Sequence, residues 1–339
     1  MDKVLTISIA AYNVEQYIEK TLNSLICDEE HIKKLEVIII NDGSKDSTAK
    51  IAQKYVELYP ETFILVDKEN GGYGSTINTS LSLATGKYYK LLDGDDWVDT
   101  IELQKLLDSL AVTEADMAIT KYKVVSDIDN SESIVTRDYT YDGVIKDFGV
   151  VDAKDALAMH FIAYRTSILK DHKITITEKC FYTDVEYILK PIPYVNTVVF
   201  IDACVYMYRV GREGQSVSIT SWQKHIDQAL IVTYRLIDFW NTIQNDNKVS
   251  TFKKQYIYNR ILGTARYKYR VLLSFPPSQQ KFSEIMQYDR IIRDSCKKIY
   301  SDCAKKLEIK LLRTRAYFIY WALSKQYRNR LFKKGELSV

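Results

Sequence analysis

Apolar runs and amphipathic stretches alternate over the first hundred residues. Short runs rich in β-branched and aromatic residues predict four strands, at residues 4–11, 36–41, 63–67 and 87–93. Between them, apolar residues recur at helical spacing and predict three helices, at residues 14–25, 47–59 and 75–84. The alternation predicts a right-handed, mostly parallel α/β sheet flanked by helices, which binds ligands beyond the carboxyl ends of its strands.

The pattern becomes mixed after residue 115 and helical near residue 221. Strand-like runs at 117–125 and 195–201, with a helical stretch at 152–159, predict an α+β continuation of the same sheet. From Trp222 onward helical spacing dominates; Pro276 and Pro277 interrupt it, and Ser278 can cap the next helix. We therefore expect an α/β domain at residues 1–220, in halves of 1–115 and 116–220, and a helical appendage at residues 221–339.

Charge is distributed unevenly along the 339 residues. The chain carries 47 Lys and Arg against 44 Asp and Glu, a net charge of +3. Residues 251–339 hold 21 of the basic and 6 of the acidic side chains, so their net charge is +15 and that of residues 1–250 is −12. An acidic body with a basic tail suggests two separate tasks.

Composition excludes several classes of protein. No apolar run approaches the ~20 residues that span a bilayer, and the start of the chain has no signal-peptide pattern. The five Cys are scattered without a CxxC pair, which is typical of reduced thiols rather than a disulfide frame or a zinc site. With 12% aromatic residues the chain is not a disordered one. We expect a folded cytoplasmic protein.

Three carboxylates follow the fourth predicted strand, at Asp93, Asp95 and Asp96. Like charges this close repel one another unless a cation lies among them, and Mg²⁺ and Mn²⁺ prefer oxygen ligands of this kind. The alternative is a solvated acidic turn in which Asp95 or Asp96 caps the next helix. The position at the end of a parallel strand favours a metal site.

A second polar segment follows the second predicted strand. Asp42 precedes Gly43 there, and a carboxylate in this place suits a base N–H or a ribose hydroxyl, whereas an Asx turn explains it less well. Residues 70–78 are rich in glycine, which lets backbone approach a nucleotide, although a turn with a helix cap fits the segment equally.

Together these segments resemble the motifs of family 2 glycosyltransferases. The resemblance covers roughly residues 1–220 and rests on four motifs in the family's order: Ala10-Ala11-Tyr12-Asn13, Asn41-Asp42-Gly43-Ser44, Glu69-Asn70-Gly71-Gly72 and Asp93-Gly94-Asp95-Asp96. It implies the GT-A fold, a nucleotide-sugar donor with UDP as the expected nucleotide, and a Mn²⁺ or Mg²⁺ cofactor. It also implies these contacts: Ala11, Tyr12 and Asn13 beside the nucleoside, Asp42 on the uracil edge, Asn70, Gly74 and Gly94 near the nucleotide, Asp93 near the ribose, and Asp95 on the metal that bridges the diphosphate.

The resemblance further implies which residues act on the acceptor and on the leaving group. Residues 181–187 take the place of the family's Glu-Asp pair, which makes Asp184 the expected general base and Glu186 its rival. The segment 206–218 resembles the one that closes over the diphosphate, so the expected donors to the leaving phosphate are Arg209 or Arg212, Gln215 and Ser216. His160 either faces the acceptor or is an ordinary half-buried histidine.

The basic tail has two explanations of equal weight. Apolar residues at helical spacing over 307–331, with Lys and Arg between them, are typical of helices that lie on an anionic membrane surface. A helical bundle that packs its apolar stripe onto the catalytic domain and leaves Lys solvated explains the same pattern. The two explanations are compatible, with the basic face meeting lipid or a polyanionic acceptor. No nucleic-acid recognition motif is present.

The expected function is therefore that of an inverting, metal-dependent glycosyltransferase, located in the cytoplasm and peripherally at the inner face of the membrane. It would transfer a hexose or N-acetylhexosamine from the nucleotide sugar to a hydroxyl of a glycan, glycolipid or glycoprotein acceptor; self-association stays open. The alternatives are a sugar nucleotidyltransferase, which would need a basic glycine-rich loop after the first strand, and a non-catalytic partner subunit.

Overall fold

The computed structural model describes residues 2–212, 215–216 and 218–337, which contacts divide into two compact units. The sheet unit comprises residues 2–151, 156–179 and 183–212. The helical unit comprises residues 152–155, 180–182, 215–216 and 218–337. The division thus falls before residue 220, and two short segments of the predicted α/β domain pack with the helices.

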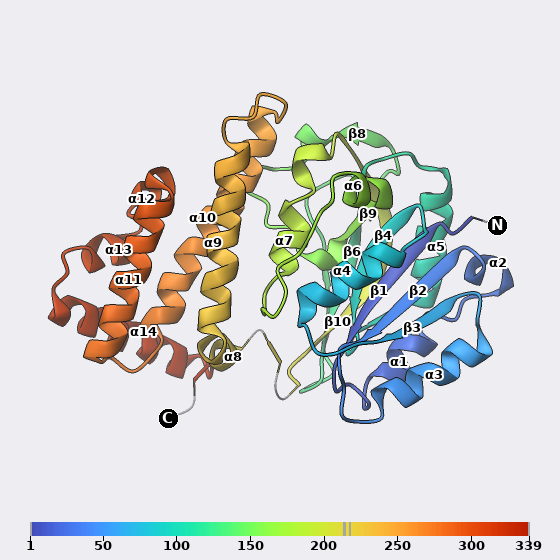
Figure 1. Ribbon diagram of the computed structural model, residues 1–339, viewed down its shortest axis with the longest axis horizontal. Helices are drawn as coiled ribbons and strands as arrows, with labels where there is room; N and C mark the ends of the chain where they lie inside the picture. The colour runs from blue at the N-terminus through green and yellow to red at the C-terminus, as the bar shows by residue number, and fades with distance from the viewer. Residues whose placement is uncertain (1, 213–214, 217, 338–339) are drawn as a thin grey trace. The chain divides into compact units, whose positions relative to one another are not determined.

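One ten-stranded sheet runs through the described part of the sheet unit (Figure 1). Its strands are β1 (Leu5–Ala11), β2 (Leu35–Asn41), β3 (Phe63–Asp67), β4 (Tyr88–Asp93), β5 (Trp97–Val98), β6 (Met117–Ser126), β7 (Glu132–Val135), β8 (Ile145–Asp147), β9 (Ile162–Arg165) and β10 (Thr197–Val210). The order is β3-β2-β1-β4-β9-β6-β10-β5, with β7 beside β6 and β8 beside β10. Strands β3, β2, β1 and β4 are mutually parallel, and β10 is parallel to β6. The predicted, mostly parallel central sheet is confirmed.

Helices cover both faces of this sheet. They are α1 (Ile18–Asn23), α2 (Glu29–Ile32), α3 (Thr48–Leu58), α4 (Tyr73–Leu83), α5 (Thr100–Val112), α6 (Thr166–Asp171) and α7 (Asp184–Leu189), with 3-10 turns η1 (Phe148–Val150), η2 (Met159–Phe161) and η3 (Ile192–Tyr194). Ile7 and Ile9 of β1 pack into a core shared with α1, α3 and α5. Because side chains alternate along a strand, Ser8 points to the opposite face, where its hydroxyl lies 2.7 Å from that of Ser80 in α4.

Two predicted elements differ from the structure. The helix predicted at 152–159 is wrong: this segment is largely irregular, and only η2 begins within it. The carboxylate of Asp152 accepts a hydrogen bond from the N–H of Lys154 at 2.8 Å, a local bond that competes with helix formation. The strand predicted at 195–201 is longer than expected, because its pairing with β6 resumes after an irregularity and continues to Val210.

The helical unit is built around α10. Its helices are α8 (Ile219–Lys224), α9 (Ile226–Ile243), α10 (Thr251–Leu273), α11 (Gln279–Ser295), α12 (Lys297–Cys303), α13 (Leu307–Leu312) and α14 (Tyr317–Lys333). Helices α9, α11, α12 and α14 all contact α10. The predicted cap is confirmed, since the hydroxyl of Ser278 accepts a hydrogen bond from the N–H of Lys281. None of the described helices combines the length and the apolar character that crossing a membrane requires.

Gly74, in the first turn of α4, gives a test of this packing. A Cβ at Gly74 would lie 2.0 Å from the carbonyl oxygen of Thr177, so Gly74→Ala should lower the free energy of unfolding by about 1–3 kcal/mol. A Cβ at Gly263 in α10 would meet no atom within 4 Å, so Gly263→Ala should raise stability by up to about 1 kcal/mol. Urea unfolding without ligand measures both. If Gly74→Ala were as stable as the native chain, Gly74 would not be required by packing.

Candidate active site

Three neighbouring strands end at one edge of the sheet and bring the predicted motifs together. Ala11 at the end of β1 pairs with Asn41 on β2, and Ala10 pairs with Asp93 on β4. The N–H of Asp42 donates to the carbonyl of Ala11 at 2.9 Å. The loops after β1, β2 and β4 therefore start side by side, as the parallel arrangement predicts.

Asn13 ties the loop after β1 to the loop after β2. Its φ of 51° turns the chain sharply, its N–H donates to the Ser44 hydroxyl at 3.0 Å, and its Oδ1 accepts from the N–H of Lys45 at 2.8 Å. The preceding Tyr12 is 52% exposed. An exposed ring on a fixed loop can stack on a planar ligand such as a nucleobase.

The carboxylate of Asp42 is buried and organises the glycine-rich segment. It accepts hydrogen bonds from the N–H groups of Gly71 and Gly72, both at 2.8 Å, and from Nζ of Lys68 at 2.9 Å. The side chain of Asn70 donates to the carbonyl of Asp42 at 2.9 Å. No sequence pattern indicated this structural role of Asp42. Uracil recognition by Asp42 stays a prediction, and it would use the carboxylate's remaining lone pairs.

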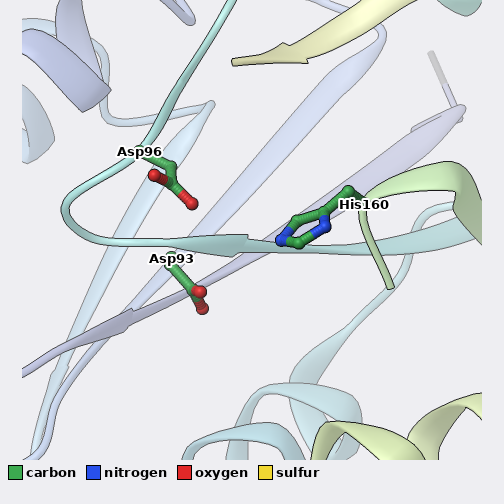
Figure 2. Close-up of side chains that lie close together, drawn as sticks. All are labelled: Asp93, Asp96 and His160. Carbon is green, nitrogen blue, oxygen red and sulfur yellow. The ribbon is translucent and has the colours of Figure 1, made fainter. Parts of the chain in front are cut away.

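Asp93, Asp96 and His160 form a cluster at the end of β4, which we call the trio. Their ligand atoms all lie within 4.8 Å of one another, and the side chains come from β4, the following turn and η2 (Figure 2). Oδ1 of Asp93 and Nδ1 of His160 are buried and have no hydrogen-bond partner among the described residues. Carboxylate oxygens with an imidazole nitrogen suit Mn²⁺ or a similar divalent ion. The trio fits a metal site.

Burial sets the protonation of these groups. Burial, and then the charges of Asp95 and Asp184, raise the pKa of Asp93 to about 7. Burial and the charge of Asp93 raise the pKa of Asp96 well above its ordinary value. Burial, aided by the charge of Lys90, lowers the pKa of His160 to about 3. The imidazole is therefore a neutral potential ligand, and a divalent cation would replace protons on the carboxyl groups.

The predicted metal ligand Asp95 lies beside this trio and not within it. Its carboxylate accepts a hydrogen bond from Nε of Arg212, and its carbonyl accepts one from Nε of Arg209 at 2.8 Å. Arg209 also forms an ion pair with Asp127 at 2.8 Å. Both arginines proposed for the leaving phosphate are thus held next to the acidic turn, and Arg212 would compete with a cation for Asp95.

The two candidate bases, Asp184 and Glu186, both lie on α7 but have different surroundings. Glu186 is fully buried and accepts hydrogen bonds from the N–H and hydroxyl of Thr177, at 2.7 and 2.9 Å, and from Nζ of Lys190 at 3.1 Å. Asp184, the first residue of α7, is only half-buried. Its charge acts on Asp93 and on Tyr73, whose pKa is raised by burial and then by Asp93 and Asp184. Asp184 therefore lies near the trio, whereas the Glu186 carboxylate is occupied by hydrogen bonds from Thr177 and Lys190.

Three other predicted contacts have structural explanations or lie elsewhere. A Cβ at Gly94 would lie 2.8 Å from the carbonyl of Ala10, so Gly94 is required for packing on β1. Gln215 and Ser216 belong to the helical unit, where the carbonyl of Ser216 accepts a hydrogen bond from the Tyr182 hydroxyl at 3.0 Å. Their role at a diphosphate stays a prediction.

Asp96 belongs to the acidic cluster predicted to hold a metal, but no individual contact was predicted for it. The alternative of a helix cap at Asp95 or Asp96 is wrong, because Asp99 caps α5 by accepting from the N–H groups of Ile101 and Glu102. The Asp96 carboxylate accepts from the Tyr206 hydroxyl at 2.6 Å and from the N–H of Arg209 at 2.7 Å. Those partners come from β10, far along the sequence, so no local signal could have revealed them.

Comparison with known proteins identifies this chain as a glycosyltransferase and gives its family. Residues 6–173 match the model of "Glycosyl transferase family 2". "Putative glycosyltransferase EpsH" of Bacillus subtilis is 24% identical over 74% of this chain and 72% of EpsH. "Glycosyltransferase GlyA" of Streptococcus pneumoniae is 30% identical over 36% of this chain, but that match spans only 17% of GlyA. The chain belongs to glycosyltransferase family 2.

Solved structures support the same fold. The structure of Staphylococcus aureus TarS residues 1–349 in complex with UDP-GlcNAc matches with a TM-score of 0.70 at 18% identity, over 96% of this chain and 92% of that chain. TarS is a poly(ribitol-phosphate) beta-N-acetylglucosaminyltransferase, 23% identical over 63% of this chain and 36% of its own length. The sheet and its helices therefore have the GT-A fold, as the sequence motifs implied.

The structural role of Glu186 is testable without substrate. Replacing the carboxylate by an amide in Glu186→Gln leaves an N–H donor facing other donors, so we expect a loss of roughly 1–3 kcal/mol in the free energy of unfolding. Glu178→Gln alters an exposed carboxylate nearby and serves as the control, with a change within about 0.5 kcal/mol. Urea unfolding at neutral pH compares them. Equal stabilities would mean that the buried carboxylate is not required for folding.

Proposed function

We propose that this enzyme is an inverting glycosyltransferase that moves a hexose or N-acetylhexosamine from a UDP-sugar to a hydroxyl of a glycan, glycolipid or glycoprotein. The observation that carries the proposal is the trio at the carboxyl end of β4, together with the nearby carboxylate of Asp184, whose charge acts on Asp93. The UDP-GlcNAc complex of TarS supports a UDP-sugar donor. Its name specifies a β-linked product, and forming a β-linkage from an α-linked nucleotide sugar requires inversion.

The acidic turn fits a Mn²⁺ or Mg²⁺ ion. The proposed ligands are Asp93, Asp96 and His160, with Asp95 as the ligand that the family resemblance implies. When bound, the ion would supply positive charge that stabilises the departing diphosphate.

The chain's own side chains would do the remaining work. Asp184 accepts the proton of the acceptor hydroxyl as it attacks the anomeric carbon. Arg209 and Arg212, held beside Asp95, donate hydrogen bonds to the leaving phosphate as its charge develops. Tyr12 stacks on the base from the loop that Asn13 fixes.

The proposed location is the cytoplasm, at the inner face of the membrane. All five cysteines are free thiols, in agreement with a reducing compartment. The excess of Lys and Arg in residues 251–339 would attract anionic lipid.

A panel of nucleotide sugars tests the donor and the metal together. We expect UDP-sugars, and not GDP- or CDP-sugars, to raise the unfolding temperature by a few degrees in Mn²⁺ and less in EDTA, because a ligand at a hundredfold excess over Kd adds about 2.7 kcal/mol. Two variants test the proposed metal ligands separately: His160→Gln alters the trio, and Asp95→Asn alters the ligand that the family resemblance implies. Loss of the Mn²⁺-linked shift in Asp95→Asn alone would leave the trio without a metal role, and no response to any UDP-sugar would contradict the proposed donor.

Replacing Asp184 tests the general base. Asp184→Asn removes the proton acceptor, so UDP release from the donor should slow by roughly 10²–10⁴-fold, while stabilisation by the UDP-sugar is retained. Asp171→Asn, which alters an exposed carboxylate at the end of α6, is the matched control and should keep normal turnover. Near-normal turnover of Asp184→Asn would assign the base to another residue.

A further inference from the structure

Helix α14 exposes two aromatic side chains on the face turned away from its own bundle. Tyr320, Ser324 and Leu331 of this helix are buried. Phe318 is 72% exposed and Trp321 is 44% exposed. Residues three and four positions apart share a helix face, so Phe318, Trp321 and Lys325 form one stripe, which we call the aromatic stripe. Two large aromatic side chains exposed side by side mark a binding surface.

The region around the aromatic stripe carries an excess of positive charge. Residues 305–336 contain ten Lys and Arg against two Glu. Part of this charge is structural, because Arg313 forms an ion pair with the buried Asp289 at 2.8 Å. Six exposed side chains have no ion pair among the described residues: Lys306, Lys310, Arg315, Lys325, Arg330 and Lys333. Within the aromatic stripe, Nζ of Lys325 lies 4.8 Å from the Trp321 ring centre.

A groove between α10, α13 and α14 lies on another side of α14 and shares no lining residue with the aromatic stripe. It has a volume of about 600 Å³, and its apolar lining is formed by Leu273, Leu307, Leu311, Leu323 and Leu331. Its cations are Arg270, Arg330 and Lys334, of which Arg270 and Lys334 lie 3.4 and 3.8 Å from Glu308 and Glu336. Arg330 has no ion pair among the described residues, and the other uncompensated cations lie outside the groove, on and around α13 and α14.

We infer that the aromatic stripe docks this enzyme on an anionic lipid bilayer. Phe and Trp rings favour the headgroup region, where the apolar ring is buried and the indole N–H stays hydrated. Lys325 and Lys333 contact the lipid phosphates, whose negative surface potential complements the charge of this region. This docking rests on the proposed membrane location and identifies the surface that would produce it. Vesicle binding tests the docking without measuring sugar transfer.

Vesicle sedimentation of the full chain tests the docking. The chain should bind vesicles of phosphatidylcholine with phosphatidylglycerol and leave vesicles of phosphatidylcholine alone unbound. Binding should weaken from about 0.05 to about 0.5 M salt, because the Debye length shortens. The double variant Lys325→Glu/Lys333→Glu should bind at least about tenfold more weakly, and so should Phe318→Ser/Trp321→Ser.

Matched variants in the sheet unit control for net charge and exposed apolar area. Lys50→Glu/Lys54→Glu reverses two exposed lysines of α3, and Ile101→Ser/Val112→Ser alters two exposed apolar residues of α5. Both should bind like the native chain. Binding that is equal on neutral vesicles, absent on anionic ones, or weakened as much by the control variants would overturn the inference. The inference would also be overturned if the native chain bound no vesicles and formed dimers that Phe318→Ser/Trp321→Ser converted to monomers. The aromatic stripe would then join two copies of the chain.

Discussion

The shared edge of three parallel strands is the constraint on which the rest of the site depends. Strands β2, β1 and β4 run in register, so Ala11 lies opposite Asn41 and Ala10 opposite Asp93. The motifs that follow these strands are separated by tens of residues in sequence, yet their loops begin side by side. A one-residue slip would turn every side chain of a strand to the other face and would separate the loops from the helices that hold them.

Burial of like charges is the second constraint, and it is met by residues from distant parts of the chain. Asp93 and Asp96 lie in a buried turn, where unpaired charge is costly. The Tyr206 hydroxyl and the N–H of Arg209 bind Asp96, and Arg212 binds Asp95, so β10 and the residues after it compensate the turn after β4. Oδ1 of Asp93 and Nδ1 of His160 are left without partners among the described residues, which is why this turn suits a cation.

The residues of the basic tail divide into two sets, those buried in the helical unit and those exposed on it. Ile285, Tyr288 and Ile292 of α11 are buried in the helical unit, and Arg313 neutralises the buried Asp289. These residues fold the bundle. Phe318 and Trp321, with the exposed cations of α13 and α14, are not among the buried residues of that core. The net charge of +3 thus combines an acidic sheet unit with a basic helical unit.

Sequence alone determined the parallel sheet, the order of its motifs and the glycosyltransferase family, because apolar periodicity and short motifs are local properties of a chain. It did not reveal that Asp42 holds the glycine segment, that Glu186 is buried against Thr177, or that His160 joins Asp93 and Asp96. It also predicted a helix at 152–159 where a side-chain bond of Asp152 favours an irregular segment. The site features depend on contacts between residues far apart in the chain, so only the tertiary structure decides them, whereas the segment at 152–159 is shaped by a local bond that apolar periodicity does not reveal.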